Sequence, residues 1–236
     1  MIIDVIIPVF NESDSIRHVV RDIPRSWTLE GEECVVRDVI VVDNDSTDDS
    51  ARVAADSGAV VIFEKIRGYG SACLKGMAHI AARPESQQPD TVVFLDGDYS
   101  DYPEEMPNLV HPLKTGYDMV IGSRALGQRE RGSMAPQQVF GNWLATNLIR
   151  LLYKVEFSDL GPFRAISYPK LLELGMVDRN YGWTVEMQVK AAKHGFRCID
   201  VPVNYRKRIG VSKVTGTVKG TIMAGYKIIT TIFRYI

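Results

Sequence analysis

The sequence predicts an α/β fold in which a mostly parallel central sheet is flanked by helices, and two observations support this prediction. Short runs rich in Val and Ile alternate with stretches of helical periodicity, as where 38–46 is followed by 46–58. The runs are apolar almost throughout, which is typical of strands buried on both faces of a parallel sheet. Together these features indicate consecutive βαβ units.

The expected elements follow in order along the chain. Strands are expected at 4–10, 38–46, 59–64, 91–98, 117–124, 161–167 and 196–206. Helices are expected at 13–23, 46–58, 70–82, 136–155 and 184–195. Ser13 is the expected N-cap of the first helix, because a serine hydroxyl can accept a hydrogen bond from a free backbone N–H.

The 236 residues suit one large domain with an appendage. We divide the chain into a body at 1–215 and an amphipathic helical extension at 216–236, whose apolar residues recur at helical spacing. The stripe on this extension comprises Ile222, Tyr226, Ile229, Phe233 and Ile236.

Charge is distributed unevenly along the chain. The formal net charge of −1 predicts no nucleic-acid partner. Beyond Asp200, however, there are seven Lys or Arg residues and no Asp or Glu. A basic end on an acidic body indicates an anionic partner at that end.

Cysteine use and apolar segments bear on the expected compartment. The three cysteines are widely spaced and form neither a disulfide framework nor a zinc pattern, which favours a reducing compartment. The N-terminal run lacks the basic segment and the cleavage site of a signal peptide, so none is predicted. No stretch of about 18 uncharged apolar residues predicts a transmembrane helix.

Polar side chains follow three of the expected strands at the point where each strand ends. Asn11 and Glu12 follow the first strand, and Asp43 closes the apolar part of the second. Asp96 and Asp98 stand at the end of the strand at 91–98. Because the carboxyl ends of parallel strands open at one edge of the sheet, these side chains should converge there and form a ligand site.

Asp96 and Asp98 bracket a glycine in an Asp-x-Asp pattern. Two carboxylates this close repel each other unless a cation holds them. Mg²⁺ and Mn²⁺ prefer oxygen ligands and commonly retain waters and substrate phosphates in their shell. With the other acidic strand ends, the pattern favours a metal bridge to a nucleotide diphosphate over a solvated acidic loop.

Three other readings of this edge are less consistent with the residues. A dinucleotide-binding fold needs G-x-G-x-x-G after the first strand, where this chain has no glycine. A P-loop is excluded because no G-K-[ST] occurs. The run "VVFLDGDYS" resembles the nucleophile motif of haloacid-dehalogenase-type phosphatases. That family also needs a later acidic pair, and the downstream aspartates stand apart.

Five motifs occur in an order and spacing similar to family 2 glycosyltransferases of the GT-A fold. They are "VIIPVFNE", "VIVVDNDSTDDS", "RGYGSACLKGM", "VVFLDGDYSDYPE" and "DMVIGSR". The segment 181–213 most resembles the dolichyl- or polyprenyl-phosphate mannose and glucose synthases. The resemblance covers about residues 3 to 215 and implies inverting transfer from a nucleotide sugar such as UDP-glucose or GDP-mannose.

The resemblance assigns the donor side of the site. Pro8 and Glu12 would line the nucleoside pocket, with Asp43 on the base or ribose. Asp96 and Asp98 would bind Mg²⁺ or Mn²⁺ and the diphosphate. The synthases carry a Gln two places after the second Asp, where this chain has a Ser followed by another Asp, so the third metal ligand stays open.

The resemblance also assigns basic residues to the phosphates. Arg124 of "GSR" would reach the donor or acceptor phosphate. The segment "R-x-R-x-G-x-S-K" would close over the phosphates with Arg206, Arg208, Ser212 and Lys213. Cationic donors of this kind would stabilise the charge that builds on a departing nucleoside diphosphate.

The acceptor decides whether a general base is needed. A polyprenyl or dolichyl phosphate is already anionic, whereas a sugar or protein hydroxyl needs a base, for which Asp159 and Glu186 are the candidates. We expect a cytoplasmic enzyme in peripheral contact with the cytoplasmic face of a membrane, with a membrane-anchoring subunit or homo-oligomer as further partners. The alternatives are a hydroxyl acceptor or a non-catalytic subunit that binds nucleotide sugar.

Two aromatic features are open to two interpretations. The stripe around Trp143 in 136–155 is either core or an amphipathic helix lying on a membrane. Trp183 in "YGWT" either stacks on a sugar or lipid or packs in the core.

Overall fold

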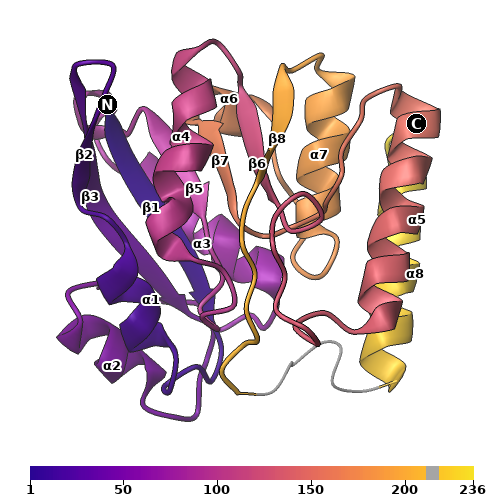
Figure 1. Ribbon diagram of the computed structural model, residues 1–236. Coiled ribbons are helices and arrows are strands. Elements are labelled where there is room, and N and C mark those ends of the chain that lie inside the picture. The colour runs from indigo at the N-terminus through magenta and orange to yellow at the C-terminus, as the bar shows by residue number, and fades with distance from the viewer. Residues whose placement is uncertain (211–217) are drawn as a thin grey trace.

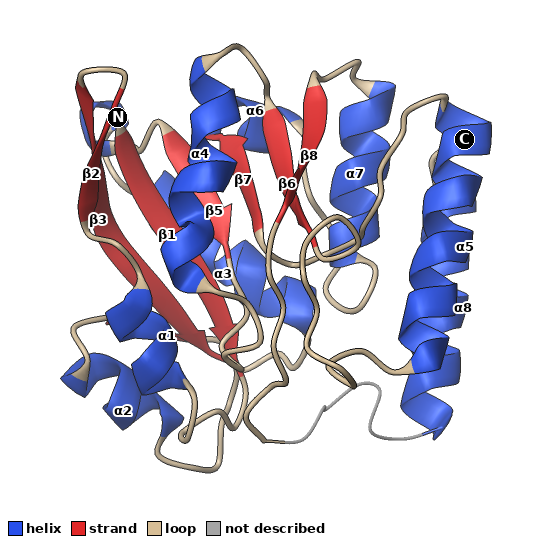
Figure 2. Ribbon diagram, viewed as in Figure 1, coloured by secondary structure: helices blue, strands red, loops and turns tan. Residues whose placement is uncertain are grey.

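An eight-stranded sheet forms the centre of the protein, with helices on both faces (Figures 1 and 2). The structure is a computed structural model that describes residues 1–210 and 218–236, except the side chains of 218–222 and 224. The strands are β1 (Ile2–Val9), β2 (Ser26–Leu29), β3 (Glu32–Asp43), β4 (Val60–Phe63), β5 (Thr91–Phe94), β6 (Met119–Ser123), β7 (Arg164–Ser167) and β8 (Cys198–Pro202).

The strand order is β2-β3-β1-β5-β7-β6-β8, with β4 also paired to β3. Strand β1 is parallel to both β3 and β5, β3 is parallel to β4, and β6 is parallel to β8. The antiparallel members are β2 on β3 and β7 between β5 and β6. This arrangement confirms the predicted α/β fold with a mostly parallel sheet.

Eight α-helices occur in the described part of the chain. They are α1 (Ile16–Asp22), α2 (Ser50–Asp56), α3 (Tyr69–Ala81), α4 (Met106–Lys114), α5 (Pro136–Tyr153), α6 (Tyr168–Glu173), α7 (Trp183–Lys193) and α8 (Val218–Arg234). Short 3₁₀ turns lie at Glu85–Gln87 and Pro103–Glu105. Two apolar cores result, one on each face of the sheet, because the central strands are buried on both sides.

Several local predictions were wrong in detail. The N-cap of α1 is Ser15, not Ser13, and its side chain makes no capping bond. The Ser15 hydroxyl instead donates to the carbonyl of Gly97 at 2.8 Å, which ties the start of α1 to the Asp-x-Asp turn. Strand β5 ends at Phe94, before the aspartates, and β2, α4 and α6 were not predicted.

Helices α5 and α8 lie side by side at one end of the molecule (Figure 1). On α8, Ile232 is buried, whereas Tyr226 and Phe233 of the predicted stripe are exposed, as is Ile236, which lies beyond the end of the helix. The side chain of Ile222 lies outside the described residues, as does the domain boundary expected at 215. Within the described part of the chain, no helix is both long enough and apolar enough to cross a membrane.

Candidate active site

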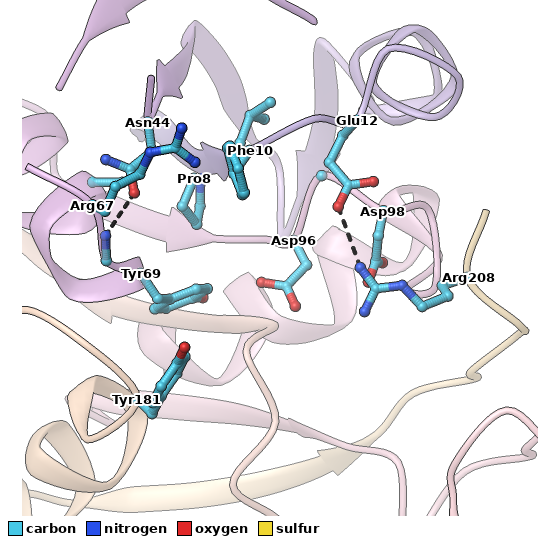
Figure 3. Close-up of a pocket in the computed structure, with 14 residues that line it drawn as sticks. Pro8, Phe10, Glu12, Asn44, Arg67, Tyr69, Asp96, Asp98, Tyr181 and Arg208 are labelled. Atoms are coloured by element: carbon cyan, nitrogen blue, oxygen red, sulfur yellow. Dashed lines mark hydrogen bonds and ion pairs between the residues drawn. The ribbon is translucent and has the colours of Figure 1, made fainter. Parts of the chain in front are cut away.

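Three parallel neighbours, β3, β1 and β5, bring their carboxyl ends together at one edge of the sheet. A cavity of about 380 Å³ opens there (Figure 3). Its lining residues include Pro8, Phe10, Glu12, Asn44, Arg67, Tyr69, Asp96, Asp98, Tyr181 and Arg208. The sequence correctly placed Pro8, Glu12 and both aspartates on this edge.

Asn44 organises one end of this first cavity. Its side-chain amide donates to the carbonyls of Glu64 and Ile66 at 2.9 and 2.8 Å, and its Oδ1 accepts from the N–H of Gly68 at 2.8 Å. These bonds hold the loop that places the Arg67 guanidinium 3.7 Å from the centre of the Phe10 ring. Asp43, which was predicted to contact the base or ribose, is buried and is not among the described residues that line this cavity. The neighbouring Asn44 lines it instead.

Asp98 is largely occupied by protein partners. It is 4% exposed, and its Oδ1 accepts hydrogen bonds from the backbone N–H and the hydroxyl of Ser100 at 2.9 and 2.5 Å. Its Oδ2 lies 3.0 Å from Nη2 of Arg208. Ser100, which stands two places after the second Asp, therefore supports the Asp98 carboxylate with two hydrogen bonds.

Asp96 has the opposite character. Its Oδ1 is buried and has no hydrogen-bond partner among the described residues. Burial, followed by the nearby charge of Asp98, raises the pKa of Asp96 to about 7. A buried, unsatisfied carboxylate at a cavity wall is well suited to receive a cation.

The donor set therefore fits a divalent metal held by Asp96 and Asp98. Both are hard oxygen ligands on one turn, and their mutual repulsion would be relieved by a cation. No group of three or more His, Cys, Asp or Glu that could hold a metal occurs in the described part of the chain. Substrate phosphates and water commonly complete the ligand shell of a protein-bound Mg²⁺.

The two predicted arginines of the basic segment have different positions. Arg208 lines the cavity and bridges Glu12 and Asp98, at 3.2 and 3.0 Å. Arg206 instead donates to the carbonyls of Tyr99 and Asp101 at 2.6 and 3.0 Å. Its guanidinium also packs on the rings of Tyr99 and Tyr102, so it braces the turn after the aspartates. Ser212 and Lys213 lie outside the described residues.

A second cavity, of about 310 Å³, adjoins the first. Both are lined by Tyr69, Asp96, Asp98, Tyr181 and Arg208. Arg124 and Tyr205 add to its polar end. The rest of its lining comes from α5, α7, α8 and the loops before α5 and before β7, with Met134, Gln138, Gly141, Asn142, Leu160, Pro162, Thr184, Gly225 and Ile228.

Arg124 is held in this second cavity by Asp159. Oδ2 of Asp159 accepts from the backbone N–H and Nε of Arg124, at 2.7 and 2.8 Å, and Oδ1 accepts from Nη2 at 2.7 Å. Burial acts to raise the pKa of Asp159, but the guanidinium outweighs it and lowers the pKa below its ordinary value. Asp159 is therefore a poor proton acceptor and a good anchor for Arg124.

Glu186, the other candidate base, does not reach either cavity. It is fully buried in α7 and accepts hydrogen bonds from the backbone N–H of Val177 and of Asp178, at 3.1 and 2.7 Å. Tyr235 and Lys190 contact it as well, each at 2.8 Å. Its position suits a brace for the segment before α7 and does not suit a general base.

Sequence reasoning assigned no role to Asn44, Tyr69 or Tyr181, although Asn44 is among the polar residues that follow the second expected strand. Asn44 stood next to the chosen Asp43, so its position after a strand was an available signal. Trp183, which was considered for stacking, is 1% exposed and packs edge-on against Phe94, 5.8 Å between ring centres. The exposed aromatic of "YGWT" is Tyr181, two residues earlier.

The fold and the site define a glycosyltransferase of the GT-A type: an Asp-x-Asp turn at the carboxyl edge of the sheet, where two adjoining cavities meet. Residues 4–175 match the family model described as glycosyl transferase family 2. The chain therefore belongs to glycosyl transferase family 2.

Two curated relatives and a solved structure are similar to the chain. An uncharacterised glycosyltransferase of Mycobacterium tuberculosis is 34% identical over 225 residues, 94% of each chain. The undecaprenyl-phosphate mannosyltransferase of Micrococcus luteus is 28% identical over 91% of this chain and 88% of its own length. The M. tuberculosis glucosyl-3-phosphoglycerate synthase, crystallised with Mn²⁺, UDP-glucose and phosphoglyceric acid, shares the fold. Its TM-score is 0.72 at 24% identity, over 99% of this chain and 79% of that one.

Proposed function

We propose that this protein transfers a sugar, with inversion, from a nucleotide sugar to a polyprenyl or dolichyl phosphate. One observation carries the proposal: two adjoining cavities share Asp96 and Asp98, and the second adds the cation of Arg124 and the apolar side chains of Met134, Leu160 and Ile228. A nucleoside diphosphate suits the first cavity, and a phosphate with a hydrocarbon tail suits the second.

On the donor side, the diphosphate would meet Asp96 and Asp98 through a divalent metal, Mg²⁺ or Mn²⁺. When bound, the metal supplies Lewis-acid stabilisation of the departing diphosphate. Arg208 lies on the same wall and can shift from Asp98 and Glu12 to phosphate oxygens, since a guanidinium forms bidentate bonds to both groups. The nucleoside would extend toward Phe10, Asn44 and Arg67.

On the acceptor side, Arg124 supplies a fixed cation at the polar end of the second cavity. Its three bonds to Asp159 orient the guanidinium before the substrate arrives, so little ordering remains to be done on binding. An acceptor phosphate is already ionised at neutral pH and needs no proton removed. A site whose candidate bases are both engaged elsewhere is consistent with such an acceptor.

The known relatives offer two kinds of phosphorylated acceptor. The Micrococcus enzyme is named for undecaprenyl phosphate, and the structural neighbour was crystallised with phosphoglyceric acid. A cationic end would serve either acceptor. The apolar wall of Met134, Leu160 and Ile228 favours the lipid phosphate, because a small polar acid would leave it unused.

A lipid acceptor requires access to a membrane surface, and we propose peripheral contact through the α5 and α8 face. Phe140 and Trp143 on α5 are 61% and 58% exposed and pack on each other, 5.9 Å between ring centres. Tyr226 on α8 is 66% exposed. Exposed aromatic side chains beside a lipid-binding cavity are suited to the headgroup region of a bilayer.

An acceptor panel tests the proposal. Purified protein receives labelled UDP-glucose or GDP-mannose with Mn²⁺ and, in parallel, polyprenyl phosphate, the matching polyprenyl alcohol, phosphoglyceric acid or a free hexose. The proposal requires product with the lipid phosphate at a rate at least about a hundred times that with the alcohol. Preferential transfer to phosphoglyceric acid or to a hydroxyl would replace the lipid phosphate by that acceptor.

A further inference from the structure

The segment 177–182 presents Tyr181 at the junction of the two cavities. Tyr181 lines both, together with Tyr69 and the two aspartates of the Asp-x-Asp turn, and it is 39% exposed. Figure 3 shows Tyr181 extending from the wall opposite Pro8 and Phe10, with its hydroxyl directed toward Tyr69. The family resemblance over 181–213 begins at this side chain but assigned it no role.

The segment 177–182 is held beside the first cavity by close backbone contacts. The N–H of Ser71 donates to the carbonyl of Arg179 at 2.9 Å. Glycine is required at two neighbouring positions, because a Cβ at Gly68 would lie 2.1 Å from the Arg179 carbonyl oxygen. A Cβ at Gly70 would lie 2.0 Å from that of Asp178. The start of α3, which borders the first cavity, therefore sets the position of this segment.

Buried carboxylates fix the same segment from the other side. Oδ1 of Asp178 accepts from the N–H groups of Asn180 and Gly182, at 2.7 and 3.2 Å, so the chain is turned tightly around Tyr181. Asp178 also forms an ion pair with Lys227 of α8 at 2.8 Å. Glu186 holds the N–H groups at the beginning of the segment. Tyr181 is thus an exposed aromatic residue on a rigid support.

We infer that Tyr181 contacts the transferred hexose and helps to select it. The inference rests on the proposed function, because a sugar passed from the first cavity to the second must lie where they meet. One face of a pyranose presents C–H groups, which an aromatic ring can cover, while a phenol hydroxyl can bond to a sugar hydroxyl. Because its support is rigid, Tyr181 can discriminate among hexoses that place their hydroxyl groups differently.

Binding of nucleotide with and without its sugar isolates this contact. Calorimetry measures the Kd of UDP, UDP-glucose, GDP and GDP-mannose, each with Mn²⁺, for the wild type, Tyr181→Ala and Tyr181→Phe. For the pair that the wild type binds, Tyr181→Ala should change the Kd of the nucleoside diphosphate less than twofold. The same substitution should raise the Kd of the corresponding nucleotide sugar about tenfold. Tyr181→Phe keeps the aromatic ring, so its Kd for the nucleotide sugar should lie between those of the wild type and Tyr181→Ala.

Tyr117→Ala is the matched control, since this tyrosine lies before β6 and in neither described cavity lining. It should leave all four constants unchanged, and melting curves check that each variant is folded. Equal weakening of nucleotide and nucleotide sugar by Tyr181→Ala, or no weakening of either, would overturn the sugar contact. A wild type that binds neither nucleotide sugar would overturn the proposed function itself.

Discussion

Asp159 and Arg124 form the most completely satisfied charged pair of the site, with three hydrogen bonds between them. The sequence placed both residues at the site but assigned Asp159 as a candidate base. The pair instead suits a positioning role, in which the carboxylate orients the guanidinium toward an anionic substrate. A base would lie free at the cavity, whereas Asp159 is 1% exposed.

Asp159→Asn should therefore lower kcat/KM for the acceptor phosphate by about 10²-fold, in line with the loss of one oriented cationic donor. The KM for the nucleotide sugar should change little. The pH–rate profile distinguishes positioning from base catalysis, because its shape should be the same in wild type and variant. Loss of an acidic limb in the variant would identify Asp159 as a base.

Asp101 gives a pH-dependent prediction. Both of its carboxylate oxygens are buried without a hydrogen-bond partner among the described residues. Burial, with the charge of Asp96 adding to it, raises the pKa of Asp101 well above its ordinary value. In the unfolded chain the pKa of this carboxyl is about 3.9. The native state therefore binds more protons above that pH, and the free energy of unfolding falls as pH rises.

Asp101→Asn removes this proton linkage while nearly preserving shape. We expect the variant to gain stability relative to wild type as pH rises above about 4, because only the wild type releases a proton from this carboxyl on unfolding there. In acid the difference in the free energy of unfolding between the two proteins should become independent of pH. Urea unfolding in EDTA between pH 4 and pH 8 measures the difference, and a difference that does not vary with pH would contradict the linkage.

At the level of elements, the sequence predicted best where burial determines residue type. Strand β1 and the second half of β3, at 39–43, are buried on both faces, so they read as runs rich in Val and Ile. Strand β2 and helix α6 have four and six residues, too few to show a period. Contacts over long sequence separations, such as Arg206 with the Tyr99 carbonyl, left no local pattern to detect.

Two helical glycines test how packing overrides helix propensity. In α3, a Cβ at Gly76 would lie 2.7 Å from Cγ2 of the fully buried Ile6. Gly76→Ala should therefore destabilise the protein by about 1–3 kcal/mol through overpacking. In α5, a Cβ at Gly141 would meet no described atom within 4 Å. Gly141→Ala should stabilise it by about 0.5–1 kcal/mol.

Chemical denaturation of both variants measures these changes. The opposite signs make the comparison informative, because the same substitution is made in both helices. A stabilising Gly76→Ala would show that α3 can move away from β1 without lowering the free energy of unfolding. That result would contradict the close packing of Gly76 on Ile6.

At the scale of the whole molecule, the site is assembled from segments far apart in the chain. The turn after β1, the turn after β5 and the segment after β8 meet at Glu12, Asp98 and Arg208. The sequence indicated this convergence through parallel strand ends. It did not separate Arg208, which lines both cavities, from Arg206, which does not.

The exposed aromatic residues of α5 make membrane contact testable in the whole protein. The double variant Phe140→Ser/Trp143→Ser should weaken binding to liposomes containing anionic lipid about tenfold or more. Fully burying such a side chain contributes about 1.5–3 kcal/mol. Leu172→Ser on α6 is the control, since Leu172 is 48% exposed but lies on another helix. If the double variant and Leu172→Ser float with liposomes to the same extent, the α5 and α8 face is not the surface that contacts the membrane.

The most direct test of the central claim is metal-dependent sugar transfer to polyprenyl phosphate by wild type and by Asp98→Asn. The labelled product is extracted into organic solvent after incubation with nucleotide sugar and Mn²⁺. The account predicts a labelled lipid that is lost in EDTA and reduced about 10²-fold or more in the variant. Transfer that is unaffected by both EDTA and the substitution would contradict the assignment of Asp96 and Asp98 as the metal and diphosphate site.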